Sequence, residues 1–218
     1  MLDKIKELEE KVKKLENELK KYKEREEELE NVIEEYNVLV KKQFEYFENF
    51  LSALGSNEVI DSLTRALKKE FILKFLTFYH QRCFESSKEF ALVFVDIDRF
   101  AEINSKYGRN IGDKVLIDLA KTLKRCVRIP LDSVARFGAD EFVVILSEVN
   151  KEQSKKIAQR IHKESNNIFL NNHEPISVTV SVVHFPTDRN NINELLELGE
   201  ELINRSKAEI SGGLKYVG

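Results

Sequence analysis

The first fifty residues carry a seven-residue repeat of apolar side chains, which constrains the fold more than any other feature of the chain. With Ile5 at an a position and Leu8 at a d position, twelve of the fourteen a and d sites through Phe50 are apolar. Lys and Glu fill most of the other positions, and neither Gly nor Pro occurs in residues 1–54. A 3.5-residue spacing held over seven heptads predicts a left-handed coiled coil.

The repeat predicts that residues 1–54 form a dimerisation and signalling helix. Polar residues at two of its sites, Glu26 and Gln43, lower stability but can fix the register and the number of strands. A homodimer is our expectation, and the a and d residues are also compatible with higher oligomers. The alternative is a single charged helix, which would leave its apolar stripe exposed to water. The a series is Ile5, Val12, Leu19, Glu26, Ile33, Val40, Phe47, and the d series is Leu8, Leu15, Tyr22, Leu29, Tyr36, Gln43, Phe50.

The charge and the short apolar runs argue against two classes of partner. Residues 1–50 carry 11 Lys and Arg against 15 Asp and Glu, and the remainder carries 24 against 23, so the net charge of -3 divides into -4 and +1. Without a basic stripe we expect no nucleic-acid binding. The longest apolar runs are far shorter than the roughly 20 residues of a membrane-spanning helix, so we expect no membrane span.

The N-terminus and the cysteines indicate a cytoplasmic protein. Charged residues begin at Asp3, and no signal-peptide pattern is present. Cys83 and Cys126 have neither a CxxC spacing nor a nearby His cluster, so we expect buried thiols rather than a disulfide or a zinc site. The four scattered histidines are expected to have surface or packing roles.

A second domain of different texture is expected over residues 55–218. Gly55 interrupts the heptads, and a helical stretch with apolar residues from Leu63 to Phe78 is expected to join the coil to this domain. Short apolar strands then alternate with amphipathic helices, which predicts an α/β sandwich with helices on a mixed or antiparallel sheet. The expected strands are 91–95, 133–136, 142–146 and 177–185, and the expected helices are 114–127, 152–166 and 193–207.

Acidic side chains stand at the ends of two of these strands. Asp96 and Asp98 follow the first, and Asp140 and Glu141 directly precede the third. If the two strands are neighbours, Asp96 and the later pair converge, and such a cluster needs a hard divalent cation, for which Mg²⁺ is the natural candidate. Gly138 permits a positive φ and leaves backbone N–H groups open to a phosphate. Metal-assisted phosphoryl chemistry is one interpretation, and turn formation with Asp98 as a helix N-cap is the other.

Three blocks of sequence resemble the GGDEF family of diguanylate cyclases. They are residues 96–104 (DIDRFAEIN), 107–116 (YGRNIGDKVL) and 135–142 (ARFGADEF), and their order and spacing are specific to that family. Residues 61–64 resemble the opening motif of the family and residues 177–183 resemble its late strand, so the likeness covers roughly residues 58–217.

The resemblance implies a fold like the palm of nucleotidyl cyclases and polymerases. It also implies condensation of two GTP into cyclic di-GMP, with release of two pyrophosphates. Each of two facing domains would hold one GTP, and the 3′-hydroxyl of one nucleotide would attack the α-phosphate of the other. The cofactor would be Mg²⁺ or Mn²⁺.

By position, the resemblance also implies ligands for the metal. Asp96 and Asp140 would bind it through their side chains, and Ile97 would bind it through its backbone carbonyl. Asp140 would in addition activate the attacking hydroxyl, and Glu141 would assist at the metals.

The same resemblance implies a substrate site. Asn104 and Asp113 match the family positions that read the guanine edge, and an Asp can accept hydrogen bonds from two guanine N–H groups. Gly138 and Ala139 lie in the signature turn beside the phosphates, and Lys207 matches the late triphosphate-binding lysine. An N-cap role for Asp113 stays open as an alternative.

Several positions depart from the family pattern. Ala139 stands in place of the second signature glycine, where its methyl group could crowd the phosphate. Ala101 replaces a lysine, and Ser211 replaces an arginine, with Arg205 or Lys215 as possible substitutes. Two lost cationic contacts would weaken triphosphate binding, because charge-assisted hydrogen bonds contribute about 1.5–3 kcal/mol each.

The inhibitory site of the family is also degenerate. Its RxxD motif falls on residues 129–132, where Ile129 replaces the arginine and only Asp132 is retained, although Arg128 is adjacent. We therefore expect high-affinity feedback inhibition by cyclic di-GMP to be lost.

Three functions compete at this point. The first is a diguanylate cyclase dimerised by its coiled coil, which the retained acids and guanine readers favour. The second is a degenerate module that binds GTP or a protein signalling partner and reports through the coil. The third is a structural adaptor that keeps the fold alone.

Overall fold

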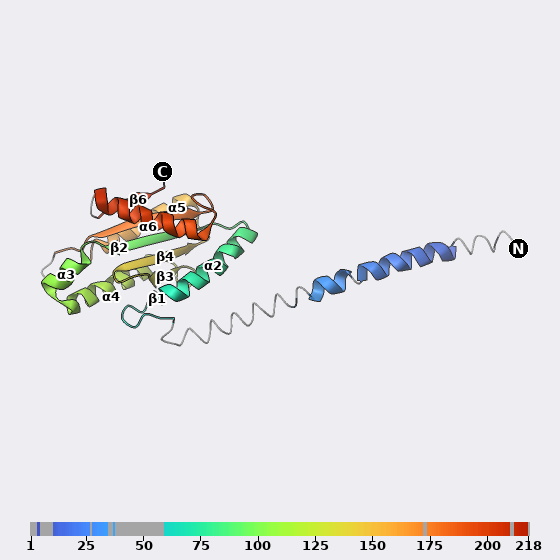
Figure 1. The fold of residues 1–218 in the computed structure, drawn as a ribbon, viewed down its shortest axis with the longest axis horizontal. Coiled ribbons are helices and arrows are strands. Elements are labelled where there is room, and N and C mark those ends of the chain that lie inside the picture. The colour runs from blue at the N-terminus through green and yellow to red at the C-terminus, as the bar shows by residue number, and fades with distance from the viewer. Residues whose placement is uncertain are drawn as a thin grey trace. The chain divides into compact units, whose positions relative to one another are not determined.

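The computed structural model describes residues 4, 11–26, 28–34, 37, 59–171, 174–209 and 212–217. Residue contacts divide the chain into two units, 1–54 and 55–218, and each is described by itself. In the first unit, residues 11–26 and 28–34 are helical (Figure 1). The described apolar a and d side chains of this helix are 52% to 71% exposed: Val12, Leu15, Leu19, Tyr22, Leu29 and Ile33. The predicted coiled coil stays a prediction, and its sites at 5, 8, 36, 40, 43, 47 and 50 lie outside the described residues.

The second unit is built on a six-stranded mixed sheet with the order β1-β3-β4-β2-β5-β6. β2 is antiparallel to both β4 and β5, and β3 is antiparallel to β4, whereas the outer pairs β1–β3 and β5–β6 are parallel. The strands are β1 (Leu67–Lys68), β2 (Phe90–Ile97), β3 (Ser133–Arg136), β4 (Glu141–Ser147), β5 (Val178–Phe185) and β6 (Leu214–Tyr216). The helices are α2 (Lys69–Glu85), α3 (Phe100–Tyr107), α4 (Arg109–Arg125), α5 (Lys151–Ser165) and α6 (Ile192–Glu209). The predicted α/β fold with a mixed sheet is confirmed.

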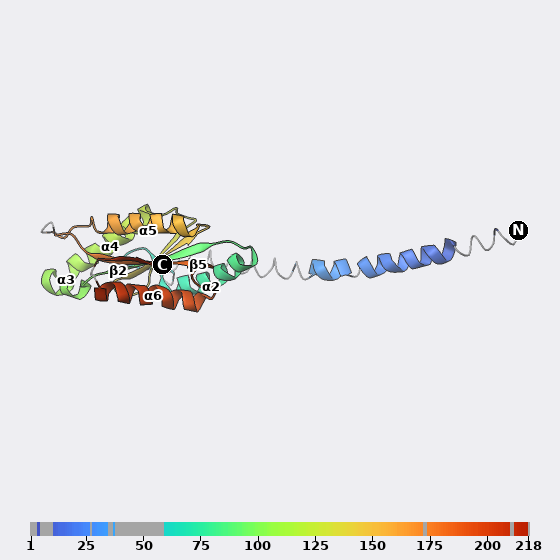
Figure 2. The same cartoon turned by 90° about the horizontal axis from the view of Figure 1, so that it is seen from above.

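Helices cover both faces of this sheet. Figure 2 shows α4 and α5 on one face and α2 and α6 on the other. The side chains of β2 alternate between the two cores: Val93 and Val95 belong to one cluster, and Leu92 and Phe94 belong to the other. Every residue of β2 and β5 is buried, which explains why these strands are nearly continuous apolar runs.

The segment before α2 differs from the prediction of a continuous helix from residue 63. Residues 61–68 form a turn and the short strand β1, and α2 begins at Lys69. Asp61 closes the turn, because its Oδ1 accepts hydrogen bonds from the backbone N of Thr64 at 2.8 Å and from its hydroxyl at 2.7 Å. Arg65 then takes a left-handed conformation with φ 57°, which a helix does not allow.

The remaining elements match the expectations with shifted ends. α4 begins at Arg109, five residues earlier than expected, and α3, β1 and β6 were not anticipated. Cys83 and Cys126 are free and buried, as predicted, and burial raises the pKa of both thiols. None of the described helices has the length and apolar character that crossing a membrane requires.

Candidate functional site

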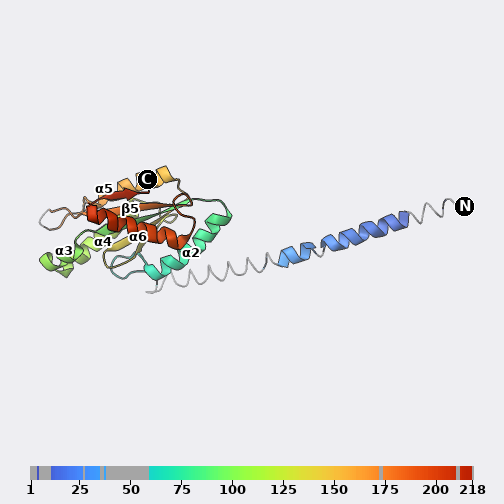
Figure 3. The same cartoon turned by 45° about the horizontal axis from the view of Figure 1, so that its top comes forward.

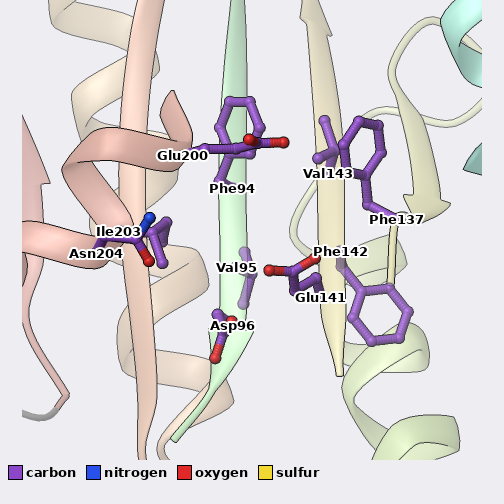
Figure 4. Close-up of a pocket in the computed structure, with 10 residues that line it drawn as sticks. All are labelled: Phe94, Val95, Asp96, Phe137, Glu141, Phe142, Val143, Glu200, Ile203 and Asn204. Carbon is purple, nitrogen blue, oxygen red and sulfur yellow. The ribbon is translucent and has the colours of Figure 1, made fainter. Parts of the chain in front are cut away.

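Two acids from neighbouring strands meet at one end of the sheet. Asp96 on β2 is directly opposite Glu141 on β4 in the antiparallel register, and opposed residues project from the same face. The backbone N–H of Ile97 donates to the carbonyl of Asp140 at 3.2 Å, which brings that residue to the same strand end. In Figure 4 the Glu141 carboxylate points from β4 toward β2. The expected convergence of Asp96 with Asp140 and Glu141 is therefore present.

The Asp96 carboxylate is buried in an acidic surrounding. Asp96 is 4% exposed, and the Lys207 ammonium from the last turn of α6 lies 2.5 Å from its Oδ1. The pKa of Asp96 is raised to about 6, with burial as the largest cause; the adjoining Lys207 ammonium lowers this pKa, and the charges of Asp140 and Glu141 raise it. One lysine thus faces three acids, which leaves negative charge unmatched.

This donor set fits a magnesium ion that arrives together with a phosphate ligand. Among the described residues, no three Asp, Glu, His or Cys side chains are placed to form a complete metal cluster. Mg²⁺ does not need one, because it commonly binds through one or two carboxylates, substrate phosphates and water. The unmatched charge around buried Asp96 supplies the attraction for a hard cation.

The turn between β3 and β4 is held by an arginine that sequence reasoning missed. Arg136 Nη2 donates to the carbonyl of Ala139 at 2.7 Å, and its Nε donates to the carbonyl of Gly138 at 3.2 Å. Arg136 Nη1 also lies 3.3 Å from Asp61 Oδ1. Asp61 opens residues 61–64 and Arg136 lies in residues 135–142, so their opposite charges were the signal that could have linked them.

Gly138 leaves space for Glu141 and does not serve a special backbone conformation. Neither Gly138 nor Ala139 has a positive φ, so this turn does not use the left-handed conformation that Gly138 permits. The turn closes instead through the N–H groups of Phe137 and Gly138, which both donate to the carbonyl of Glu141 at 2.7 and 3.2 Å. A Cβ on Gly138 would lie 2.5 Å from Glu141 Oε2 and 3.3 Å from its Cβ. The backbone accepts Ala139, whereas a side chain at 138 would displace the Glu141 carboxylate.

Asn104 and Asp113 lie on the paired helices α3 and α4. Gly108, with φ 86°, separates the two helices and is the N-cap of α4. A Cβ on Gly112 would lie 1.9 Å from Asn104 Oδ1, so the amide rests against the α4 backbone beside Asp113. Asp113 lies inside α4 and is exposed. The alternative that it caps this helix is wrong, because the helix begins four residues earlier.

Asp98 is not a helix cap either. Its carboxylate is 5% exposed and accepts hydrogen bonds from Ser177 Oγ at 2.5 Å and from Thr179 Oγ1 at 2.7 Å. The N-cap of α3 is Arg99, in a left-handed conformation with φ 53°. Asp98 therefore ties the end of β2 to β5, and sequence reasoning had no signal for its two hydroxyl partners.

A cavity of about 170 Å³ opens beside the two acids, between α6 and the sheet. Asp96, Glu141, Glu200 and Asn204 give it polar walls, and Glu200 and Asn204 come from successive turns of α6 (Figure 4). Figure 3 shows α6 lying along the sheet, with α3 at one end. Neither α6 residue was predicted. The apolar lining consists of Phe94, Val95, Phe137, Phe142, Val143 and Ile203.

The chain matches a known domain family over most of this unit. The family described as "Diguanylate cyclase, GGDEF domain" matches residues 58–212. This chain belongs to the GGDEF family. The match covers the acids of β2 and β4, both helices α3 and α4, and Lys207, so all of the candidate site lies within the GGDEF domain.

Relatives of the GGDEF chain include curated proteins and solved structures. The Bacillus subtilis protein YhcK is 30% identical over 169 residues, which cover 76% of this chain and 44% of that protein. Diguanylate cyclase A of Treponema denticola is 28% identical over 167 residues, covering 71% and 44%. The GGDEF domain of PA1120 from Pseudomonas aeruginosa superposes with a TM-score of 0.68 at 28% identity, covering 73% of this chain and 94% of that one. The chain thus spans less than half the length of these two curated relatives.

The two cations that we expected as substitutes for Ala101 and Ser211 are already paired. Arg205 lies 2.6 Å from Glu201 one turn earlier on α6, and Lys215 pairs with Glu209. Ala101 is exposed in the first turn of α3, and position 211 lies outside the described residues. Neither Arg205 nor Lys215 is held toward Asp96 in this structure.

Asp132, the one residue retained from the expected inhibitory motif, is bound by groups of the chain itself. Asp132 Oδ2 accepts hydrogen bonds from the backbone N of Arg128 at 2.8 Å and from its Nε at 3.0 Å, and Oδ1 accepts one from Nη2 at 2.9 Å. The backbone N of Ser147 donates to the same Oδ1 at 2.9 Å. Arg128, which lies one position before the arginine of the family motif, therefore binds the Asp132 carboxylate.

Proposed function

We propose that this chain is a diguanylate cyclase, which condenses two GTP into cyclic di-GMP and releases two pyrophosphates. The observation that carries the proposal is the meeting of Asp96 with Asp140 and Glu141 at one strand end, within reach of Lys207. Family membership supports the reaction class. The metal would be Mg²⁺ or Mn²⁺.

The chemistry divides among the residues of this edge. The 3′-hydroxyl of one GTP attacks the α-phosphorus of the other, the bond to the β-phosphate oxygen breaks, and the hydroxyl proton leaves to a base. Asp140 is our candidate for that base, and Asp96, the carbonyl of Ile97 and Asp140 would hold the metal, with Glu141 assisting. When bound, the metal would stabilise charge on the reacting phosphate and on the leaving pyrophosphate.

The guanine base is assigned to the paired helices. Asp113 presents an exposed carboxylate that can accept from two guanine N–H groups, and the Asn104 amide lies beside it across Gly112. Adenine would place an acceptor against the same carboxylate, which disfavours ATP. Lys207 and the turn at Gly138 and Ala139 would meet the phosphates.

Two domains must face each other for the reaction, and the N-terminal helix supplies the means. Its described a and d side chains are exposed on the single chain, and a parallel coiled coil would bury them. We propose a homodimer through this helix, located in the cytoplasm, whose two domains each hold one GTP.

A second candidate is a degenerate GGDEF module that binds GTP or a protein partner and signals through the coil. The pairing of Arg205 and Lys215 with acids favours it, because fewer cations then remain for a triphosphate. The hydrogen bonds that occupy Asp132 support loss of product feedback under either candidate.

The test is product formation by the full chain. Purified protein is incubated with GTP and Mg²⁺, and separately Mn²⁺, and cyclic di-GMP is sought by mass spectrometry. Asp140→Asn should abolish the product, and Asp118→Asn is the matched control, because Asp118 is an acid of α4 that pairs with Lys121 at 3.6 Å. GTP binding to a dimer without product would establish the degenerate module instead.

A further inference from the structure

Lys207 holds the buried acid of the candidate site from the solvent side. Its side chain is 38% exposed, whereas that of Asp96 is 5% exposed, and Nζ lies 2.5 Å from Oδ1. The ammonium therefore stands where a cation has to be if the carboxylate is to stay ionised in a poorly hydrated position.

The same ammonium is suited to leave this position. Lysine carries a compact charge on a flexible four-carbon stem, and it makes point contacts rather than a fixed planar fork. A triphosphate brings several negative charges, which compete with the single Asp96 carboxylate for that one charge. Lys207 cannot fully satisfy both.

Two other cations near the C-terminal end of α6 have acidic partners of their own. Arg205 lies against Glu201, and Lys215 lies against Glu209. When Lys207 leaves Asp96, the vacated position next to the acids is open to a cation from solution.

We propose that Lys207 is an exchangeable cation, which keeps divalent metal away from Asp96 until a nucleoside triphosphate draws the ammonium away. The metal then enters with the nucleotide rather than before it. This inference rests on the proposed role of Asp96 as a metal ligand, but it concerns binding order and not turnover. It assigns Lys207 a second task besides contact with the triphosphate.

The first measurement is Mn²⁺ binding to the full chain without nucleotide. Binding is monitored through the decrease of the electron paramagnetic resonance signal of free Mn²⁺. Lys207→Met should bind Mn²⁺ at least about tenfold more tightly than the wild type, because a unit positive charge beside the carboxylate has been removed. Lys207→Arg keeps the charge and should bind as weakly as the wild type.

Arg205→Met is the matched control. It removes the same charge from the same helix, from an ion pair with Glu201 at 2.6 Å, and should leave Mn²⁺ affinity unchanged. Circular dichroism and thermal unfolding of all three variants establish that they are folded.

The second measurement adds a non-hydrolysable GTP analogue. In the wild type the analogue should tighten Mn²⁺ binding, and by thermodynamic reciprocity Mn²⁺ should tighten binding of the analogue by the same factor. In Lys207→Met this factor should be smaller, because no ammonium has to leave Asp96 before the metal binds.

Two results would overturn the inference: a folded Lys207→Met that binds Mn²⁺ no more tightly than the wild type, or an Arg205→Met that gains as much. Failure of the proposed cyclase has a different signature. The wild type would then make no cyclic di-GMP, while Lys207→Met would still bind Mn²⁺ more tightly than the wild type. That result would support the cation exchange and contradict the proposed cyclase.

Discussion

Asp96 and Asp132 are two buried carboxylates at opposite ends of β4, and the chain neutralises them differently. Asp96 lies opposite Glu141, where β4 begins, and pairs with the Lys207 ammonium at 2.5 Å. Asp132 is bound by Ser147, where β4 ends, and Arg128 supplies three further hydrogen bonds between 2.8 and 3.0 Å. They are 4% and 1% exposed, so burial alone does not separate them.

The difference teaches which end of the sheet can take a ligand. The oxygens of Asp132 are occupied by an arginine fork and backbone N–H groups, whose removal would leave donors without partners. Asp96 depends on one flexible ammonium and stands next to two further acids. Asp132 therefore stabilises the fold, whereas Asp96 remains able to bind a cation other than Lys207.

The largest expected effect is the loss of turnover when Asp96 becomes neutral. Asp96→Asn should lower the rate of cyclic di-GMP formation at least about a thousandfold, since it removes the carboxylate that we propose as a metal ligand. At pH 4.5 the same variant should unfold in urea within about 1 kcal/mol of the wild type, because the pKa of Asp96 is raised to about 6 and its folded carboxyl group is then as uncharged as an amide. Retained activity would contradict the proposed role of Asp96 in the reaction.

The reverse pattern is expected at the other end. Asp132→Ala should lower the free energy of unfolding by about 2–4 kcal/mol, because the N–H groups of Arg128 and Ser147 lose their acceptor. Urea denaturation measures this, with Asp118→Ala on α4 as a control at a half-buried acid. A loss below about 1 kcal/mol would show that the cluster does not stabilise the fold.

The pH dependence of stability should separate the two carboxylates as well. The pKa of Asp96 is raised to about 6 in the folded state, above its usual value of about 3.9. Between these values the folded protein binds the proton that the unfolded chain releases, so the contribution of Asp96 weakens the fold as pH rises from about 4 to 6. Asp96→Asn should therefore lose less stability than the wild type, by about 1–3 kcal/mol, when unfolding at pH 7.5 is compared with pH 4.5. Parallel curves for the two proteins would contradict the assignment.

The signature turn allows a smaller and more local test. Gly138→Ala should slow turnover about tenfold, because the new Cβ would lie 2.5 Å from the Glu141 carboxylate. Ala139→Gly is the paired variant, and it should change the rate by less than about threefold, since the backbone at 139 needs no glycine. A large gain from Ala139→Gly would show instead that the methyl group crowds the phosphate.

The smallest effect is expected from product feedback. Cyclic di-GMP should leave the initial rate of the wild type unchanged, because Arg128 already occupies Asp132. The exchange variant R128I/I129R restores the family spacing, with an arginine three residues before Asp132, and should gain inhibition. Tight binding of cyclic di-GMP to the wild type at Asp132 would show that Asp132, like Asp96, can take a ligand.

Sequence reasoning succeeded where a pattern had a single physical cause. The apolar run 91–95 predicted a buried strand, which is β2, and this strand is buried because helices cover both faces of the sheet. The acids at the adjoining ends of β2 and β4 converge because the two strands are neighbours. It failed where a side chain decided the local structure. The hydrogen bonds of Asp61 turned an expected helix into a turn and a strand, and those of Asp98 to β5 replaced an expected cap.

Two further features lay beyond any local pattern. The closure of Asp132 by Arg128 depends on side-chain geometry across a loop, and the approach of Glu141 to Gly138 depends on the shape of a turn. The roles of Asn104 and Asp113 came from family likeness, and the structure adds their placement on paired helices without a test of guanine binding.

The most direct test of the contrast is hydrogen–deuterium exchange of the full chain with two ligands. A non-hydrolysable GTP analogue with Mg²⁺ should slow exchange in residues 96–104, 107–116 and 138–141 and leave residues 128–132 unchanged. Cyclic di-GMP at the same concentration should leave residues 128–132 unchanged too. Protection of 128–132 by cyclic di-GMP, without protection of 96–104 by the analogue, would contradict the account.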